Sequence, residues 1–487
     1  MSTEVRNVEP KSLWNHFADL NAVPRPSKKE ERVIQFMKDF GASLQLETIV
    51  DEVGNVIIKK PASAGMEDRQ TIVMQSHLDM VHQKNADTQF DFDSQGIQMF
   101  VEDDWIKARG TTLGADNGIG VATIMALLAS SDIAHPPIEA LFTIDEETGM
   151  TGAMGLKGDL LDGSILLNLD TEDDHELTIG CAGGVDVTAT GVYIQDSTPT
   201  DMQAFQISIR GLTGGHSGMD IHKGRGNANK LMNRLLYQAA KNYQLRIASI
   251  DGGSLRNAIP RESFAVVVLP NDKVSFFEKF IDQQTKILLS EYTTTDNDLQ
   301  IAVEKTDLPK HIADQSFQSK LLSALYACPN GIYRMSPDIE DLVQTSNNLA
   351  RVVVKDGSYS VQCLTRSSVD SEKMDLATSI QGAFELLGAS ISFSGDYPGW
   401  APKPGAEIVK IMSNLYEEMF DGKADVNACH AGLECGILGT NYPDMEMISF
   451  GPNIRGAHSP DEKVQISSVQ KYWKFLLETL KRIPKSN

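Results

Sequence analysis

Cysteine and long hydrophobic runs are scarce in this sequence. The cysteines are odd in number and show no CxxC spacing, which argues against a disulfide framework and favours a reducing compartment. The longest apolar runs, such as Val121–Ala129, fall well short of the roughly 20 residues that span a bilayer. The first residues also lack the apolar core of a secretory signal. We therefore expect a cytoplasmic protein with no membrane-spanning segment. The five cysteines are Cys181, Cys328, Cys363, Cys429 and Cys435.

Positive charge is also in deficit. The 487 residues include 44 Lys and Arg against 66 Asp and Glu, which gives a formal net charge of -22. Nucleic acids and anionic membrane surfaces attract clustered positive side chains, so this balance argues against both as partners. The hydrophobic share of 41% and the charged share of 23% are ordinary globular values. The chain is long enough for roughly two to four domains, and its size favours an enzyme.

The first part of the chain alternates between strand-like and helix-like segments. Apolar runs at Thr71–Ser76, Ile138–Ile144 and Ile165–Leu169 are typical of strands that are buried on both faces. Between them, Ile119–Ser130 has the pattern of an amphipathic helix. Ser27–Glu30 has the pattern of a capping box at the start of an earlier helix. This alternation predicts an α/β fold with a largely parallel sheet covered by helices.

The pattern changes near Cys181. From there to about Ser394 the sequence predicts an α+β arrangement, which includes a strand pair that turns at Asp356-Gly357. Gly395–Pro404 is rich in proline and glycine and has the composition of a linker back to the first pattern. We therefore predict one α/β domain, formed by residues 1–186 and 398–487, that is interrupted by an inserted α+β domain at residues 187–397.

Acidic and histidine residues directly follow the predicted strands of the first domain. Ligands of open α/β sheets bind outside the carboxyl ends of the strands, so these loops are expected to meet. Each residue alone could equally be an ordinary turn, cap or surface residue, but their joint placement favours a metal site. Mixed nitrogen and oxygen donors suit zinc, manganese or cobalt better than calcium or magnesium. The residues are His77, Asp79, Asp116, Glu146, Glu147, Asp170 and His458.

Five motifs occur in an order that closely resembles the M20 metallopeptidases, within the di-zinc aminopeptidase-like enzymes. They are SHLDMV (76–81), GADNGIG (114–120), DEETG (145–149), NLDTED (168–173) and GAHSP (456–460). The resemblance covers nearly the whole chain, and residues 210–228 (RGLTGGHSGMDIHKGRGNA) are most similar to the Xaa-His (aminoacyl-histidine) dipeptidase branch. It implies a di-zinc aminopeptidase-like catalytic domain with a mixed sheet flanked by helices, an inserted α+β lid and dimerisation domain, and a homodimer. It also implies hydrolysis of dipeptides, with a preference for Xaa-His substrates such as carnosine (β-Ala-His).

The resemblance further implies a role for each residue of the predicted metal site. Two divalent metal ions per chain are expected, with zinc favoured and manganese or cobalt as alternatives. Asp116 would bridge the two ions, His77 and Asp170 would complete the first, and Glu147 and His458 the second. Asp79 would orient His77, as carboxylates that contact ligand histidines do. Glu146 would act as the general base on the attacking water.

The inserted domain carries further candidates by the same resemblance. His216 would help to hold the oxyanion, and the glycines around it allow a close approach of the backbone. Asn257 and Arg366 would bind the C-terminal carboxylate of the substrate, a task that suits the planar guanidinium. For Arg366 an ordinary surface salt bridge is an equal alternative. Gly432 would lie close to the substrate backbone.

Two hypotheses outside this family are also open. A thiol hydrolase could use Cys429 or Cys435 with His430, and it would be sensitive to alkylation but indifferent to chelators. A non-catalytic binding module would usually have lost the base or a ligand, yet all of these residues are present. Within the family, a tripeptidase, a carboxypeptidase and an N-acyl amino acid deacylase are the alternatives to an Xaa-His dipeptidase.

Overall fold

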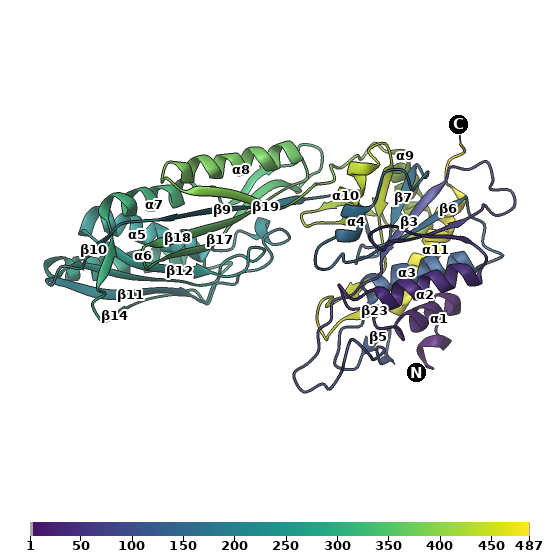
Figure 1. Ribbon diagram of the computed structural model, residues 1–487, viewed down its shortest axis with the longest axis horizontal. Coiled ribbons are helices and arrows are strands. Elements are labelled where there is room, and N and C mark those ends of the chain that lie inside the picture. The colour runs from purple at the N-terminus through teal and green to yellow at the C-terminus, as the bar shows by residue number, and fades with distance from the viewer. Residues whose placement is uncertain (1–2, 487) are drawn as a thin grey trace. The chain divides into compact units, whose positions relative to one another are not determined.

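The computed structural model describes residues 3–486 and divides the chain into two compact units (Figure 1). Unit 1 comprises Met1–Gly180, Trp400–Ala428 and Leu433–Asn487, and unit 2 comprises Cys181–Gly399 and Cys429–Gly432. The expected boundary between residues 186 and 187 falls inside strand β9 (Gly183–Val192), which lies wholly in unit 2. The segment expected to be a linker begins inside strand β19 (Ser390–Tyr397), so the chain returns to unit 1 only at Trp400.

Unit 1 is built on an eight-stranded mixed sheet in the order β1-β2-β6-β3-β7-β21-β8-β20. Its centre is parallel, because β3 pairs in parallel with both β6 and β7, and β21 pairs in parallel with β7. Towards one edge, β2 pairs antiparallel with β6 and β1. The central strands are mainly apolar and are buried along their whole length, as the sequence predicts. The strands are β1 (Glu47–Val50), β2 (Val56–Lys60), β3 (Ile72–His77), β6 (Ile138–Thr143), β7 (Ile165–Asn168), β8 (Glu176–Cys181), β20 (Asp425–Cys429) and β21 (Glu446–Ser449).

Helices flank this sheet, and the expected mixed α/β fold is thereby confirmed. A smaller four-stranded sheet in the order β22-β23-β5-β4 also belongs to unit 1. The helices are η1 (Val5–Asn7), α1 (Lys11–Leu20), α2 (Glu31–Ser43), α3 (Ala115–Ala129), α4 (Thr151–Gly155), α9 (Glu407–Met419), α10 (Glu434–Asn441) and α11 (Ile466–Lys481). The strands of the smaller sheet are β4 (Met99–Glu102), β5 (Trp105–Ala108), β22 (Ile454–Arg455) and β23 (Lys463–Gln465).

Two local predictions for unit 1 are wrong. Helix α3 is not amphipathic, because it packs between α1 and β3 and is buried on all sides from Asn117 to Leu128. The expected capping box at the start of α2 is absent, since that helix has Glu30 as its N-cap and no side-chain cap bond. The hydroxyl of Ser27 instead donates a 2.8 Å hydrogen bond to Oδ2 of Asp79. A residue with the appearance of a helix cap thus supports a carboxylate of the predicted site.

Unit 2 is an α+β unit built on an antiparallel sheet in the order β14-β11-β13-β12-β17-β18-β9-β19, with β16 added beside β17. The predicted strand pair around Asp356-Gly357 is formed by β17 and β18, and both turn residues have positive φ, as a tight hairpin requires. The remaining strands are β10 (Gln195–Ser197), β11 (Met202–Arg210), β12 (Arg246–Gly253), β13 (Ser263–Pro270), β14 (Gln300–Lys305), β15 (His311–Ala313), β16 (Gly331–Met335), β17 (Val343–Lys355) and β18 (Ser358–Ser367). The helices are η2 (Ile221–Lys223), α5 (Ala228–Tyr243), η3 (Asn271–Lys273), α6 (Val274–Glu291), α7 (Gln315–Ala327) and α8 (Asp370–Glu385).

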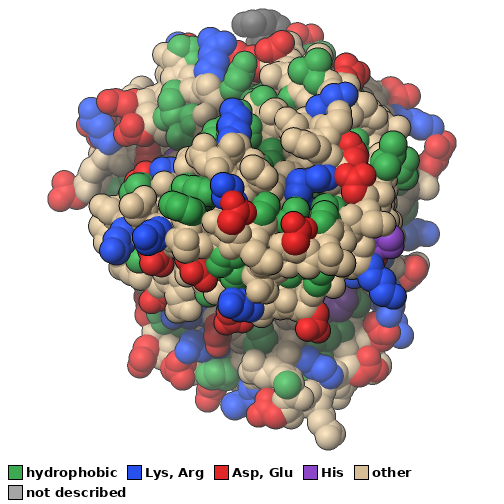
Figure 2. All heavy atoms as spheres, turned by 90° about the vertical axis from the view of Figure 1, so that its left-hand side faces the viewer, with side chains coloured by type: hydrophobic (Ala, Val, Ile, Leu, Met, Phe, Trp, Pro, Cys, Tyr) green, Lys and Arg blue, Asp and Glu red, His purple; other side chains and the backbone are tan. Residues whose placement is uncertain are grey.

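The core of unit 2 lies between its sheet and its helices. Phe205 from β11, Leu235 from α5 and Phe277 from α6 are buried in one hydrophobic cluster. On the face shown in Figure 2, acidic and basic side chains are interspersed with single hydrophobic ones. No helix within residues 3–486 is long and apolar enough to cross a membrane.

Candidate metal centre

Neighbouring strand ends bring the predicted ligands of unit 1 together. His77 is the last residue of β3, which lies between β6 and β7 in the sheet. Glu147 follows β6, and Asp170 follows β7. Because these strands are parallel, their carboxyl ends lie at one edge of the sheet, where ligands bind in open α/β folds. Asp116 reaches the same place from the first turn of α3, where its backbone is not helical.

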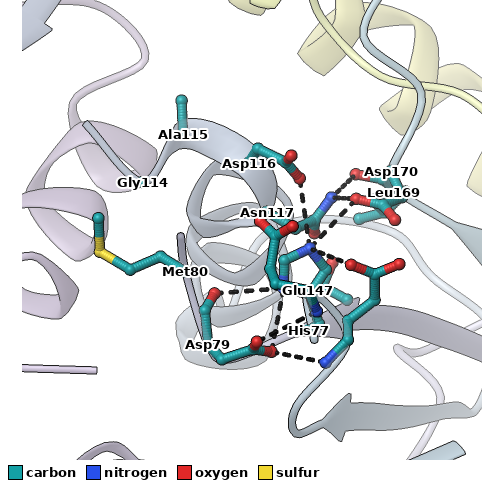
Figure 3. Close-up of polar contacts among 12 residues, drawn as sticks. His77, Asp79, Met80, Gly114, Ala115, Asp116, Asn117, Glu147, Leu169 and Asp170 are labelled. Carbon is teal, nitrogen blue, oxygen red and sulfur yellow. Dashed lines mark hydrogen bonds and ion pairs between the residues drawn. The ribbon is translucent and has the colours of Figure 1, made fainter. Parts of the chain in front are cut away.

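The imidazole of His77 lies between carboxylates (Figure 3). Its Nε2 atom is 3.2 Å from Oδ1 of Asp116 and 3.6 Å from Oδ1 of Asp170. Its Nδ1 atom is 3.4 Å from Oδ1 of Asp79, on the other side of the ring. His77 therefore presents Nε2 to two carboxylates, while Asp79 holds the ring from behind.

His458 stands in a similar relation to Asp116. Its Nε2 atom is 3.3 Å from Oδ2 of Asp116 and 2.9 Å from Oε2 of Glu147. The two oxygens of Asp116 thus face two different histidines, because Oδ1 faces His77 and Oδ2 faces His458. Two groups result that share Asp116, and in each the ligand atoms lie within 4.8 Å of one another. They are His77, Asp116 and Asp170 in the first group, and Asp116, Glu147 and His458 in the second.

The electrostatics of this cluster fit a cation between the groups. Burial, together with neighbouring carboxylates, raises the pKa of Asp170 to about 8 and that of Glu146 well above its ordinary value. Hydrogen bonds to Asp116 and Glu147 raise the pKa of His458 to about 11, so in this arrangement a proton balances part of the negative charge. Oε1 of Glu147 is buried and has no hydrogen-bond partner within residues 3–486. Carboxylates that repel one another and a buried oxygen with a vacant lone pair suit divalent cations, whose binding would displace the proton of His458.

Asp79 supports two parts of the site at once. It is fully buried, and besides His77 it accepts hydrogen bonds from the backbone nitrogens of Glu146 at 3.0 Å and Glu147 at 3.3 Å. Burial opposes ionisation of Asp79, but the hydrogen bonds from His77, Ser27 and Glu146 hold its pKa below the ordinary value. The side chain of Glu146 itself lies farther out, with Oε2 at 3.9 Å from Nε2 of His77. Asp79 therefore fixes both the ring of His77 and the loop that carries Glu146.

Three residues at the site were not predicted from the sequence. Asn117 donates to the backbone oxygen of Leu169 at 2.7 Å and also to the Asp170 carboxylate. Glu462 and Arg25 are buried beside the loop that carries Asp116. Two of them could have been found from the sequence, because Asn117 lies inside the GADNGIG motif and Glu462 closely follows GAHSP. Arg25 could not be found in this way, because a single arginine outside any motif does not indicate a function.

The predicted residue His216 lies in unit 2, in the loop after β11. Its Nδ1 atom accepts hydrogen bonds from the backbone nitrogens of Gly218 at 3.2 Å and Met219 at 3.0 Å. Burial, and to a lesser degree the charge of Arg366, lowers the pKa of His216 to about 4. The imidazole is therefore neutral at pH 7 and carries its proton on Nε2, where it can donate a hydrogen bond.

Arg366 lies in β18 of unit 2 and is only 5% exposed. Its Nη1 atom donates to the hydroxyl of Tyr397 at 2.8 Å, and its Nε atom is buried without a hydrogen-bond partner in the described part of the chain. A surface salt bridge, the alternative left open by the sequence, is wrong because the side chain is buried and its bonded partner is a neutral phenol. A buried guanidinium of this kind can donate hydrogen bonds to the carboxylate of a bound ligand.

Asn257 and Gly432 also belong to unit 2. The backbone oxygen of Asn257 accepts a 2.8 Å hydrogen bond from the nitrogen of Ser217, so Asn257 lies beside the loop of His216. Gly432 ends the short segment Cys429–Gly432, which comes from a distant part of the sequence. Unit 2 therefore brings the loops of His216 and Asn257 into contact.

The imidazole of His430 is held by a hydroxyl and by the backbone. Nε2 of His430 lies 2.7 Å from Oγ of Ser346, and the imidazole also hydrogen-bonds the backbone of Val343. Burial lowers the pKa of His430 to about 3, so it is neutral. Cys435 is buried in helix α10 of unit 1. These contacts disfavour a thiol hydrolase, because its base would have to face the sulfur.

Known proteins resemble this chain over its whole length. Residues 73–482 match peptidase family M20/M25/M40. The cytosol non-specific dipeptidase of Escherichia coli is 40% identical over 482 residues, which are 99% of each chain. The crystal structure of aminoacylhistidine dipeptidase from Vibrio alginolyticus matches with a TM-score of 0.94 and 43% identity, covering 100% of this chain and 99% of the other. Aminopeptidase PepT from Bacillus cereus shares the fold, with a TM-score of 0.57 at 15% identity and coverage of 98% and 99%.

Proposed function

Because the chain belongs to peptidase family M20/M25/M40, we propose that it is a metal-dependent dipeptidase that holds two divalent cations per chain. The family membership confirms the resemblance that the five sequence motifs indicate. The observation that carries the proposal is the position of Asp116, whose two oxygens face His77 and His458 separately. A carboxylate shared in this way lowers the repulsion between two cations and holds them at a fixed separation.

The proposed cation ligands all lie in unit 1. His77 and Asp170 would complete one cation site with Asp116, and Glu147 and His458 would complete the other; zinc is favoured, with manganese or cobalt as alternatives. Bound divalent cations supply Lewis acidity for the substrate carbonyl and lower the pKa of water. Asp79 keeps His77 in place by a carboxylate–histidine contact.

Glu146 is the proposed general base. It belongs to neither of the two groups that share Asp116, and its carboxylate lies at their edge, near Nε2 of His77. It can take the proton of the attacking water and deliver it to the leaving amine. Burial raises the pKa of Glu146, which favours uptake of a proton by this carboxylate.

The residues of unit 2 would act on the substrate. Neutral His216 has an Nε2–H with which to stabilise the oxyanion of the tetrahedral intermediate. Arg366 and Asn257 would bind the C-terminal carboxylate, and Gly432 would lie along the substrate backbone. For Arg366 the support is its burial, with no ion pair to a carboxylate within residues 3–486. A homodimer and a cytoplasmic location complete the proposal; the first rests on the family resemblance, and the second is supported by the cysteine pattern and the name of the Escherichia coli relative.

The substrate is a dipeptide, with a preference for Xaa-His peptides such as carnosine. The name of the Vibrio relative supports this preference, whereas the name of the Escherichia coli relative favours a broad range of dipeptides. Both relatives are named dipeptidases and cover nearly the whole chain, which favours a dipeptidase over a tripeptidase, a carboxypeptidase or an N-acyl amino acid deacylase.

A substrate panel after metal removal tests this function. Protein stripped with a chelator should be inactive, and adding back zinc or manganese should restore cleavage of β-Ala-His and Gly-His. Gly-Leu and Ala-Ala separate an Xaa-His preference from a broad range, and tripeptides, N-acetyl and N-succinyl amino acids test the alternatives. Full activity in excess chelator, or cleavage of the acylated amino acids alone, would overturn the proposal. Insensitivity to iodoacetamide is expected, because no thiol takes part.

Replacing His216 with alanine should lower kcat by about 10²–10³-fold, because one preorganised donor to the oxyanion is lost. The metal content should not change, since His216 lies in unit 2 and is absent from both groups that share Asp116. The measurement is kcat with a dipeptide, beside the metal content from mass spectrometry. His311→Ala is the matched control, because this histidine is exposed in β15 of the same unit. Unchanged kcat in His216→Ala would remove this residue from the mechanism.

A further inference from the structure

The loop Leu113–Asp116 is held on one side by a buried carboxylate. Oε2 of Glu462 accepts from the backbone nitrogens of Leu113 at 2.7 Å and Gly114 at 2.9 Å. Oε1 of the same side chain accepts from the nitrogens of Ala115 at 2.7 Å and Asp116 at 3.1 Å. Glu462 is 2% exposed, so these bonds are shielded from water. One side chain thus binds every backbone N–H of the loop that places Asp116.

A buried guanidinium holds the same loop through a carbonyl. Nη2 of Arg25 donates to the backbone oxygen of Gly114 at 2.6 Å, and Nη1 donates to the backbone oxygens of Leu78 at 3.0 Å and Asp79 at 3.1 Å. Arg25 therefore ties the loop before Asp116 to the segment that follows His77. A side chain at position 114 is excluded, because its Cβ would lie 2.5 Å from Nη2 of Arg25 and the φ of Gly114 is +70°.

The loop of Glu462 also carries His458. Glu462 lies four residues after His458, and the turn between them is closed by hydrogen bonds from the nitrogen of Ser459 to the oxygen of Gly456 and from the nitrogen of Glu462 to the oxygen of Ser459. Gly456 and His458 both have positive φ, so the turn is tight. Glu462 therefore fixes the position of His458 relative to Asp116, while Arg25 fixes that of Asp116 relative to the segment after His77.

We propose that Glu462 and Arg25 are positioning residues that align Asp116 with both histidines and thereby set the affinity of both cation sites together. This inference rests on the proposed function, because it assigns these two residues to the same pair of cations. Neither side chain belongs to the groups that could themselves hold a metal ion, so both act through the loop. Because Asp116 belongs to both groups, a displaced loop should weaken both sites in parallel, whereas the loss of a residue of one group should weaken one site.

The test is a titration of chelator-stripped full-length protein with Mn²⁺ alone, followed by calorimetry. Glu462→Gln keeps the shape of the side chain but places an amide NH₂ against two backbone N–H groups. We expect both dissociation constants to rise by about 10–100-fold, the usual effect of changing a residue that supports metal ligands. Arg25→Lys keeps the charge but loses the fork that joins two segments, and it should have the same parallel effect.

Matched controls separate positioning from general stability. Glu139 is a buried glutamate of β6 in unit 1 that also accepts two backbone N–H bonds, from Asp162 at 2.8 Å and Gly163 at 3.0 Å. It lies at the opposite end of β6 from Glu146, so Glu139→Gln should leave both dissociation constants unchanged. Arg69→Lys is the control for Arg25→Lys, because Arg69 donates to the backbone oxygen of Ile483 at 2.6 Å and precedes the start of β3, at the opposite end of that strand from His77.

The outcomes distinguish this inference from the function on which it rests. Wild-type protein that binds no Mn²⁺ would overturn both. Normal binding by the wild type with unchanged constants in Glu462→Gln or Arg25→Lys would overturn the positioning role only, as would weakening of a single site. If Glu462→Gln does not fold, as judged by circular dichroism, Arg25→Lys decides by the same criterion, and a third variant, Glu462→Asp, should bind more weakly than the wild type.

Discussion

Replacing Glu146 with glutamine is expected to lower kcat by about 10²–10⁴-fold, the range that a general base contributes. Glutamine has nearly the same shape but cannot take a proton from water. The backbone nitrogen of residue 146 would still donate to Asp79 at 3.0 Å, because the side chain takes no part in that bond. The loop should therefore keep its position, and KM should change little.

The metal content of this variant decides between two roles for Glu146. A base that does not bind the cations can be replaced while about two metal ions per chain remain, as expected for a two-metal site. Mass spectrometry on dialysed protein, beside kcat with a dipeptide, makes the measurement. Glu139→Gln is again the control, since it changes a buried glutamate near the start of β6, the strand that Glu146 follows. Loss of metal from Glu146→Gln would make Glu146 a ligand, and unchanged kcat would exclude it as the base.

The clustering of the proposed ligands could be predicted because parallel strands bring their carboxyl ends together. His77 ends a mainly apolar, buried strand, and Glu147 and Asp170 each follow one; such strands are recognisable in one sequence. Once these strands are neighbours, their carboxyl ends meet without further information. The order of the motifs then suggested Asp116 and His458, which lie outside the central strands.

The supporting residues could not be predicted, because their roles depend on contacts between distant segments. Ser27 has the local pattern of a helix cap, yet its hydroxyl bonds Asp79, which lies 52 positions along the chain. Glu462 binds a loop that lies 346 to 349 positions away. Local sequence patterns report the periodicity and capping of nearby residues, and tertiary contacts can override them. The amphipathic reading of α3 failed for the same reason, since its polar positions are glycine, asparagine and threonine that pack inside the unit.

The boundaries between the units also could not be predicted exactly from the sequence. A change in composition near Cys181 marked the first boundary approximately, but β9 begins only at Gly183 and continues through the expected boundary. The short segment Cys429–Gly432 also clusters with unit 2, although strand β20 leads into it and helix α10 of unit 1 follows it in the sequence. Its backbone explains this, because the nitrogen of Ala182 donates to the oxygens of Cys429 and Ala431, both at 3.0 Å. No composition signal accompanies so short a segment.

Asp116→Asn is expected to remove both cations, and with them more activity than the loss of the base alone. Asparagine keeps one oxygen but turns the other into an NH₂ donor, which repels a cation and cannot accept from the partner histidine. Oδ1 faces His77 and Oδ2 faces His458, so either orientation of the amide removes the oxygen ligand from one of the two groups. The second cation then loses the carboxylate that balanced its repulsion with the first, so kcat/KM should fall by more than about 10⁴-fold, beyond the upper range for a general base.

Asp170→Asn and His458→Ala sharpen this test, because each changes only one of the two groups. We expect these variants to keep about one metal ion per chain and Asp116→Asn to keep fewer, as a shared ligand of a two-metal site requires. The thermal midpoint gives an independent measure, because a ligand that binds the folded state raises it with concentration. Added Zn²⁺ should therefore raise the midpoint of the wild type most and that of Asp116→Asn least. If Asp116→Asn binds as much metal as Asp170→Asn, Asp116 belongs to one cation site only. That result would contradict the shared carboxylate from which the proposed function is argued.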